Sequence, residues 1–356
     1  MPRPRLPENR GLPARWRFTH SAYYYQVPPG LESRWDGKKL YRLGKTLAEA
    51  YRSWAAMIEL SDGDIQTIAQ LLDRYALEVV PLKAPKTQAS NQAAIKRLRA
   101  VFGSMRVSDL TPQHAYQYRD KRGRSAPTAA NRELEVLSHS LTKAVEWGVI
   151  KEQPLIKGAF RKLTSKPRTR YVEDWEIVEA LQLSSKRHRG SVQMIQAYIR
   201  LKLLTGLRRS DLLRLTMSDI HEDGIHVTPH KTAGSSGKRI VIEWNDDLHN
   251  AVKAAKANRS VNISPFLFCN AKGQGYIDED TGTANGWDSM WQRFMVRVLN
   301  ETKVTERFTE HDLRAKAGSD AESLEHARAL LAHASDSTTK RIYRRKAERV
   351  KPSKGV

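Results

Sequence analysis

The chain has 356 residues, a formal net charge of +22 and a single cysteine. This length predicts two or three domains, and so large a positive charge indicates a polyanionic partner, most simply nucleic acid. The single cysteine excludes an internal disulfide and a cysteine-based zinc site, and no apolar run approaches the roughly 18 residues of a membrane span. No apolar signal core follows the basic N-terminus, so we expect an intracellular protein.

Residues 1–60 predict a small sheet followed by a helix. Residues 16–27 are dense in aromatic and β-favouring types, and a second such segment covers 39–43. Thr46 and Glu49 have the spacing of a capping box and predict a helix to about residue 60. Two interpretations stay open: a module that lays its sheet against DNA, or a hairpin that decorates the next domain. The candidate DNA contacts around the sheet are Arg15, Arg17, Lys38 and Lys39.

Residues 61–156 predict an all-helical domain. Apolar residues recur at spacings of three and four in segments near 65–79, 89–102, 111–121 and 128–147. Thr111 followed by Pro112 is typical of a helix start, and Gly148 of a helix end. The candidate DNA contacts in this domain are Lys96, Arg97, Arg122 and Arg124.

A basic segment with few apolar residues, 157–170, then predicts a linker. Such a charge run is usually only solvated. Here, however, Arg168 and Arg170 could follow a phosphate backbone where the chain crosses DNA.

Residues 171–356 predict a third domain of mixed α+β type. Helical spacing appears near 172–183, 191–204, 246–257 and 287–299, and short β-type segments near 225–228, 239–243 and 266–268. Between these elements lie polar groups at helix junctions. Gly206 breaks one helix and leaves Arg208 at the junction, where Ser210 can cap the next helix.

Two later motifs hold histidines. Thr309 is placed to cap a helix on which His311 and Arg314, three residues apart, share a face. Further on, His333 ends an apolar helix, and the hydroxyl-rich residues 335–339 predict a new helix start. Tyr343 follows on a short basic helix, where neighbouring cations favour phenolate and attract phosphate. The alternative for this tyrosine is a simple core position.

Four motifs in order, TGLRRSDLLRL, HKT in a β-connection, HDLR and LAH…Y, together resemble the motif set of tyrosine recombinases, the phage integrases. The resemblance covers residues 171–356 in detail and the helical domain in architecture, and residues 1–60 only loosely resemble an arm-type DNA-binding module. It implies a multidomain, mainly α fold: a small N-terminal β-sheet/helix module, an all-α core-binding domain and a mixed α+β catalytic domain. Two departures are Ala332 in place of the usual glycine and Ala315-Lys316-Ala317 after HDLR.

The resemblance also implies a chemistry. Tyr343 would attack a phosphodiester and form a 3′-phosphotyrosyl link that needs no ATP, metal or other cofactor to be rejoined. Two arginines would hold the phosphate oxygens in planar forks. Lys231 would protonate the leaving 5′-oxygen, with Lys238 as its rival. The implied catalytic set is Arg208, Lys231, His311, Arg314, His333 and Tyr343, with Asp211 supporting Arg208.

The expected function is site-specific integration or excision of a phage or similar mobile element in the bacterial cytoplasm, associated with the nucleoid. Expected partners are duplex attachment-site DNA, three further subunits in a tetramer, a host DNA-bending protein and an excision factor. Alternatives are a transposon or chromosome-dimer resolving recombinase, a type IB-like topoisomerase, and a DNA-binding regulator on a recombinase fold. A metal site is not expected, because His226 and His230 lack carboxylate or cysteine partners in the sequence.

Overall fold

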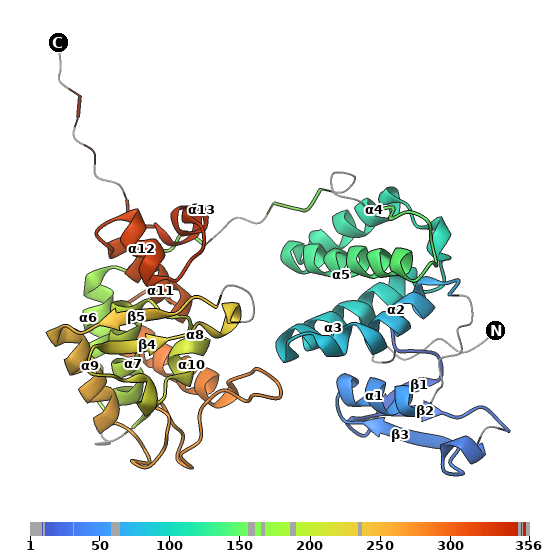
Figure 1. Cartoon of the computed structure of the whole chain (residues 1–356), viewed down its shortest axis with the longest axis horizontal. Helices are drawn as coiled ribbons and strands as arrows, with labels where there is room; N and C mark the ends of the chain where they lie inside the picture. The colour runs from blue at the N-terminus through green and yellow to red at the C-terminus, as the bar shows by residue number, and fades with distance from the viewer. Residues whose placement is uncertain are drawn as a thin grey trace. The chain divides into compact units, whose positions relative to one another are not determined.

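The computed structural model describes residues 9, 11–30, 32–57, 65–155, 161–164, 168–185, 190–233, 237–347, 350 and 352–353 (Figure 1). The chain divides into two compact units, an N-terminal unit of residues 1–166 and a C-terminal unit of residues 167–356. Their boundary lies inside the predicted linker. The predicted division between residues 60 and 61 falls outside the described residues and stays a prediction.

The N-terminal unit begins with an antiparallel sheet in the order β1-β2-β3, formed by β1 (Trp16–Thr19), β2 (Ala22–Gln26) and β3 (Leu40–Gly44). The β1–β2 turn is His20-Ser21, whose φ angles of 47° and 55° suit a two-residue hairpin turn. Neither residue is a glycine or asparagine, so the turn had no sequence signal.

Helix α1 (Leu47–Met57) lies against the sheet (Figure 1). Its predicted capping box is confirmed, since the Glu49 N–H donates to Thr46 Oγ1 at 3.2 Å and the Thr46 N–H donates to Glu49 Oε2 at 3.4 Å. The predicted helices follow as α2 (Ile68–Glu78), α3 (Pro85–Phe102), α4 (Pro112–Gly123) and α5 (Pro127–Glu146). Helix α3 starts four residues earlier than expected, because a proline is tolerated in a first turn.

The sheet and the helices of this unit share one hydrophobic cluster, which includes Trp16 and Tyr51 as well as Leu72 and Leu98. A buried polar contact also joins them. Arg99 of α3 donates to Asp73 of α2 at 3.0 Å, and the phenol of Tyr51 from α1 is hydrogen-bonded to the same guanidinium. The N-terminal sheet module is therefore packed onto the helical bundle.

The C-terminal unit has helices and a small sheet, which confirms the predicted mixed α+β type. Its helices are α6 (Asp174–Gln182), α7 (Ser191–Thr205), α8 (Arg209–Arg214), α9 (Asp246–Ala257), α10 (Asn285–Glu301), α11 (Glu310–Asp320), α12 (Leu324–Leu330) and α13 (Asp336–Thr338). Strands β4 (Gly224–Val227) and β5 (Ile240–Glu243) pair antiparallel. The strand expected at 266–268 was wrong: Phe266 forms only an isolated bridge with Thr216, too short for a strand.

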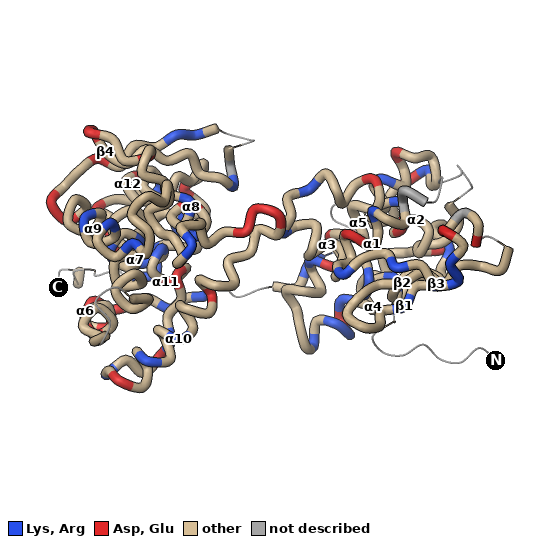
Figure 2. The backbone as a smooth tube through the Cα atoms, turned by 90° about the horizontal axis from the view of Figure 1, so that it is seen from below, with Lys and Arg blue, Asp and Glu red and all other residues tan. Residues whose placement is uncertain are grey.

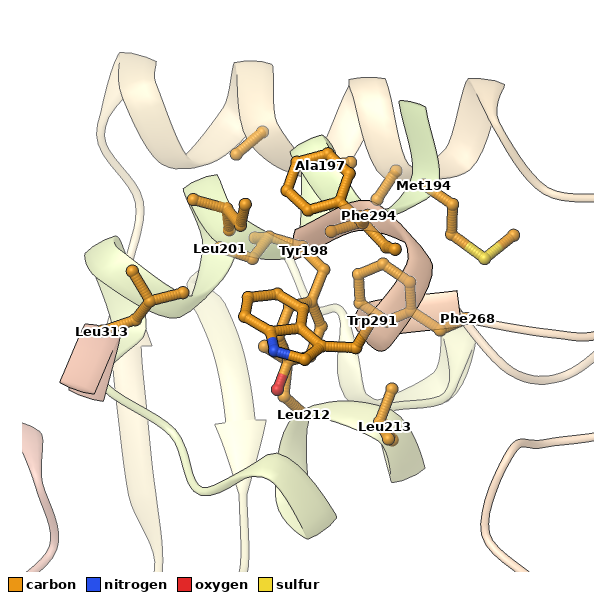
Figure 3. Close-up of a cluster of buried hydrophobic side chains, with 14 of the residues drawn as sticks. Met194, Ala197, Tyr198, Leu201, Leu212, Leu213, Phe268, Trp291, Phe294 and Leu313 are labelled. Atoms are coloured by element: carbon orange, nitrogen blue, oxygen red, sulfur yellow. The ribbon is translucent and has the colours of Figure 1, made fainter. Parts of the chain in front are cut away.

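Helix α7 is the centre of this unit. It is buried on nearly every side and contacts α9, α10 and α11, as expected for a helix that is apolar all round. Figure 3 shows Tyr198 and Leu201 of α7 among aromatic and aliphatic side chains from the surrounding elements. Tyr198 packs on Trp287 with ring centroids 4.7 Å apart. This core fixes the C-terminal end of α7, where the candidate site begins.

Among the described residues, no helix has the length and apolar character needed to cross a bilayer.

Candidate active site

Tyr343 lies at the end of a short helical segment. Ser335 caps α13 through a 3.2 Å hydrogen bond from the Ser337 N–H, which confirms the predicted helix start. The predicted basic helix is, however, a single wide turn over Thr339–Tyr343. The Arg344 N–H bonds to Thr339 O, five residues back, at 3.2 Å, and this spacing defines a π turn. The Tyr343 side chain is buried, with 8% exposure of the residue.

Two histidines and an arginine surround the Tyr343 ring. The ring centroids of His333 and His311 lie 4.7 and 5.2 Å from that of Tyr343, and the Arg314 Cζ lies 5.3 Å from it. His311 and Arg314 project from α11, as predicted from their spacing, whereas His333 follows α12. Four residues of the implied catalytic set thus meet in one place.

Arg314 joins two segments of the site. Its guanidinium donates to the backbone carbonyls of Gly206 and Leu331, the latter at 2.7 Å, and lies 3.1 Å from His333 Nε2. Burial lowers the pKa of Arg314 to about 10, so it stays cationic at neutral pH. Its Nε–H is buried and has no hydrogen-bond partner within the described part of the chain. A buried donor of this kind suits an anionic ligand.

Both histidines are neutral at pH 7. Burial, together with the charges of Arg314 and Arg208, lowers the pKa of His333 to about 4. Burial and the charges of Arg345 and Arg314 lower the pKa of His311 to about 4. Because His333 Nε2 accepts from Arg314, we assign the proton to Nδ1, which lies 2.9 Å from Thr339 Oγ1.

Arg208 lies in the short connection between α7, which ends at Thr205, and α8, which starts at Arg209. Gly206 has a φ of 58°, a left-handed conformation that ends α7. The predicted cap at Ser210 was wrong: Arg208 has the extended backbone of the N-cap position, because α8 starts at Arg209. Asp211 is buried, accepts the His230 N–H at 3.0 Å and lies 3.9 Å from Arg208 Nη1. Asp211 therefore ties the Arg208 helix to the chain that carries Lys231.

The two candidate lysines lie on either side of residues 234–236, which are outside the described range. Lys231 is exposed in a single 3₁₀ turn over His230–Thr232. Lys238 is also exposed, and its charge contributes to the lowered pKa of His333. Each remains a prediction as general acid.

The candidate DNA-contacting residues differ in exposure and in whether they already form ion pairs or hydrogen bonds within the protein. Figure 2 shows Lys and Arg throughout both units. Arg97 and Arg122 both pair with the buried Glu133, at 3.4 and 3.2 Å. Arg17 donates to Gln26, and Lys38 lies 3.7 Å from Asp36.

The remaining predicted contacts fall into two groups. Three are exposed and one is half-buried; the exposed residues are Arg15, Lys39 and Arg124, and the half-buried one is Lys96. By contrast, the two linker arginines lie on carboxylates: Arg168 on Asp312 at 2.9 Å, and Arg170 on Glu176 at 2.5 Å. These ion pairs partly neutralise the charge of both arginines within the C-terminal unit.

The expectation that His226 lacks a carboxylate partner was wrong. His226 Nε2 lies 2.8 Å from Asp223 Oδ1, because the turn before β4 brings these residues together. Even so, no cluster of three potential metal ligands occurs among the described residues.

Sequence reasoning missed Lys202. Its ammonium group is fully buried in α7 and donates to Leu207 O at 2.5 Å, next to the Gly206 carbonyl that Arg314 holds. Burial lowers the pKa of Lys202 to about 7. The sequence does show a lysine within the apolar run of α7. The helical spacing by itself gives this lysine no role.

Comparison with known proteins gives consistent matches. Residues 172–349 match the sequence profile described as the phage integrase family. An integrase/recombinase of Haemophilus influenzae strain Rd is 27% identical over 191 residues, which are 49% of this chain and 51% of that protein. The chain thus spans about half the length of this curated relative.

Solved structures share the fold. A lambda integrase tetramer bound to a Holliday junction superposes with a TM-score of 0.63 at 19% identity, covering 96% of this chain and 98% of the other. The Tn1549 transposon integrase in complex with circular intermediate DNA gives 0.59 at 15% identity, covering 77% and 94%. At these identities the likeness concerns the fold alone.

Proposed function

Because the chain belongs to the phage integrase family, we propose that it is a site-specific recombinase that cuts and rejoins duplex DNA through a 3′-phosphotyrosyl intermediate. The observation that carries the proposal is the cluster around Tyr343. A buried phenol lies beside two neutral histidines and a buried arginine, one of whose donors has no partner among the described residues. A tyrosine that served only as a core residue would not need polar side chains around its ring.

In the proposed reaction, the Tyr343 oxygen attacks phosphorus and the bond from phosphorus to the 5′-oxygen breaks. The 5′-oxygen takes up a proton, from Lys231 or from its rival Lys238. Arg208 and Arg314 stabilise the negative charge that develops on the non-bridging oxygens. The reverse attack by a 5′-hydroxyl restores the DNA backbone and frees the tyrosine.

The position of His311 supports a role as proton acceptor, because its ring lies beside that of Tyr343 with centroids 5.2 Å apart. At neutral pH the imidazole is unprotonated, so it can take the phenol proton as Tyr343 attacks. His333 begins neutral and hydrogen-bonded to Arg314. An arriving phosphate adds negative charge beside both residues, which favours protonation of the imidazole and a hydrogen bond to the phosphate.

The substrate we propose is duplex attachment-site DNA. The net charge of +22 supports a polyanionic partner, and the exposed basic residues of the N-terminal unit are available to it. One related structure is described as a tetramer on a Holliday junction, so we propose a tetramer on DNA here as well. A host DNA-bending protein and an excision factor are further proposed partners, for integration and excision of a phage or other mobile element.

The test is capture of the covalent intermediate on nicked attachment-site DNA, from which the released fragment diffuses away. Wild-type protein should form the adduct, and Tyr343→Phe should bind DNA equally well and form none. Tyr276→Phe removes a phenol from the core of the same unit and should behave as wild type. An adduct with Tyr343→Phe would contradict the assignment. Binding without any adduct in the wild type would instead support the regulator, and relaxation of plasmids that lack the site would support the topoisomerase.

A further inference from the structure

The chain immediately after the nucleophile is held in place by a buried arginine. Arg345, two residues beyond Tyr343, has a side chain only 4% exposed. Its Nη1 lies 2.6 Å from Asp312 Oδ1 and donates to the backbone carbonyl of Arg170 at 2.9 Å. The neighbouring Arg344 is exposed and donates to the carbonyl of Ala321 at 3.1 Å. Two adjacent arginines of equal charge therefore have different surroundings.

Asp312 is the centre of this contact. It is fully buried, follows His311 directly, and receives hydrogen bonds from the N–H and hydroxyl of Thr309 at 2.9 and 2.8 Å. Although burial alone raises the pKa of this carboxyl, the hydrogen bonds from Thr309 and Arg345 hold it below its ordinary value. Asp312 is thus a buried anion that needs cationic partners.

The same oxygen of Asp312 has a second cationic partner. Arg168 Nε donates to Oδ1 at 2.9 Å, and its Nη2 donates to the carbonyl of Arg307 at 3.1 Å. Arg168 belongs to the segment by which the chain enters the C-terminal unit, whereas Arg345 belongs to the segment that follows Tyr343. The Asp312 carboxylate therefore pairs with one arginine near the start of the C-terminal unit and with another near its end.

Ser319 adds a second attachment of the tyrosine segment to α11. Its hydroxyl donates to the Tyr343 carbonyl at 2.6 Å and accepts the Arg345 N–H at 2.7 Å. Ser319, near the C-terminal end of α11, consequently holds the backbone of residues 343–345, and Asp312, near the N-terminal end of α11, holds the Arg345 side chain. Helix α11 also carries His311 and Arg314, so the nucleophile and these two groups are fixed to one rigid element.

We propose that Asp312 and Arg345 are positioning residues that dock the Tyr343 segment on α11 for attack, and that Arg168, by sharing the Asp312 carboxylate, couples this docking to the ordering of the entering chain. The proposal rests on the proposed function. It assigns a role to side chains that contact the backbone and the carboxylate next to the reacting groups. A shift of about 1 Å in a reacting group costs roughly 100-fold in rate, so loss of the contact should slow attack strongly.

The first experiment compares Arg345→Gln and Asp312→Asn with Arg344→Gln, which removes the same charge one residue away. Adduct formation is measured in a single turnover at saturating nicked DNA, alongside the dissociation constant. We expect roughly 10- to 100-fold slower adduct formation for the first two variants with DNA affinity close to that of Arg344→Gln, and a wild-type rate for Arg344→Gln. Equal rates for all three variants would overturn the proposal.

A second experiment separates positioning from general damage to the site. In a Tyr343→Phe background, hydrogen peroxide is supplied as the nucleophile: a peroxide oxygen bonds to phosphorus, the bond to the 5′-oxygen breaks, and that oxygen takes up a proton. A diffusing nucleophile needs no docking, so adding Arg345→Gln should leave this cleavage rate unchanged. A fall equal to that seen with tyrosine would mean that Arg345 acts on the phosphate site itself.

A third measurement does not depend on activity. Amide hydrogen exchange of residues 339–345 should rise at least tenfold in Arg345→Gln and Asp312→Asn and stay unchanged in Arg344→Gln. Arg168→Gln should raise the same exchange by a smaller factor. Unchanged exchange in Arg345→Gln would overturn the docking role. If the wild type forms no adduct and the variants still show these exchange changes, the recombinase proposal is contradicted and the docking role stands.

Discussion

Lys202→Met tests the buried charge beneath the turn that presents Arg208. Burial lowers the pKa of Lys202 from 10.5 to about 7 in the folded protein, and the charges of Arg314 and Arg209 add to this, while Glu310 and Asp211 oppose it. The pKa of Lys202 is lower in the folded protein than in the unfolded chain. At pH values between these two pKa values, the unfolded chain therefore binds more protons. Stability therefore rises with pH across this window, by up to about 1.4 kcal/mol per pH unit.

The two pKa values set the size of the effect. Integrated between about pH 7.5 and about pH 9.5, this single group adds about 2.5 kcal/mol to the free energy of unfolding of the wild type. Lys202→Met should lack that increment. The variant also leaves the Leu207 carbonyl without its donor, but this loss is the same at both pH values and cancels in the comparison.

The assay is urea unfolding at both pH values, followed by the fluorescence of Trp287 and Trp291 beside α7. Lys253→Met, which removes an exposed lysine from α9, is the matched control and should keep the wild-type pH dependence. An equal rise of stability with pH in the wild type and in Lys202→Met would show that Lys202 does not change its protonation on unfolding in this window.

Three further outcomes are expected. Ala332 has a φ of 47°, so Ala332→Gly should raise the free energy of unfolding by about 1 kcal/mol in urea, and a less stable variant would contradict the strain. Lys231→Ala should slow cleavage of ordinary DNA by roughly two to four orders of magnitude and recover on a 5′-phosphorothiolate, whose thiolate needs no proton; recovery with Lys238→Ala alone would identify the other lysine. DNA affinity should fall steeply with salt in a log–log plot, and a slope near zero would rule out binding through the +22 charge.

Local chemistry made much of the fold predictable. Thr46 with Glu49 and Thr309 with Asp312 cap helices by hydrogen bonds that span three residues, so their spacing alone identifies the helix starts. Helix α9 has the predicted bounds, 246–257. The candidate groups of the site were also identifiable, because the order of four motifs selected a few residues from a chain rich in arginine and lysine.

The tertiary structure decided how those groups are used. Arg168 was predicted to follow DNA, yet it pairs with a carboxylate 144 residues away. Lys202 looks like an ordinary helix residue until packing buries its charge beneath Leu207. Of the two adjacent arginines after Tyr343, Arg345 reaches Asp312 and Arg344 reaches the Ala321 carbonyl, a difference that their place in the sequence does not reveal.

These features share a physical reason. A cap or a helix face depends on neighbours in the chain, and the sequence by itself determines it. Burial and long-range ion pairs depend on which segments pack together, and they decide whether a given arginine is free to bind phosphate or already neutralises a buried carboxylate. The sequence thus determined which residue types this protein can bring together, and the fold determined which of them lie around the Tyr343 ring and which contact the chain on either side of it.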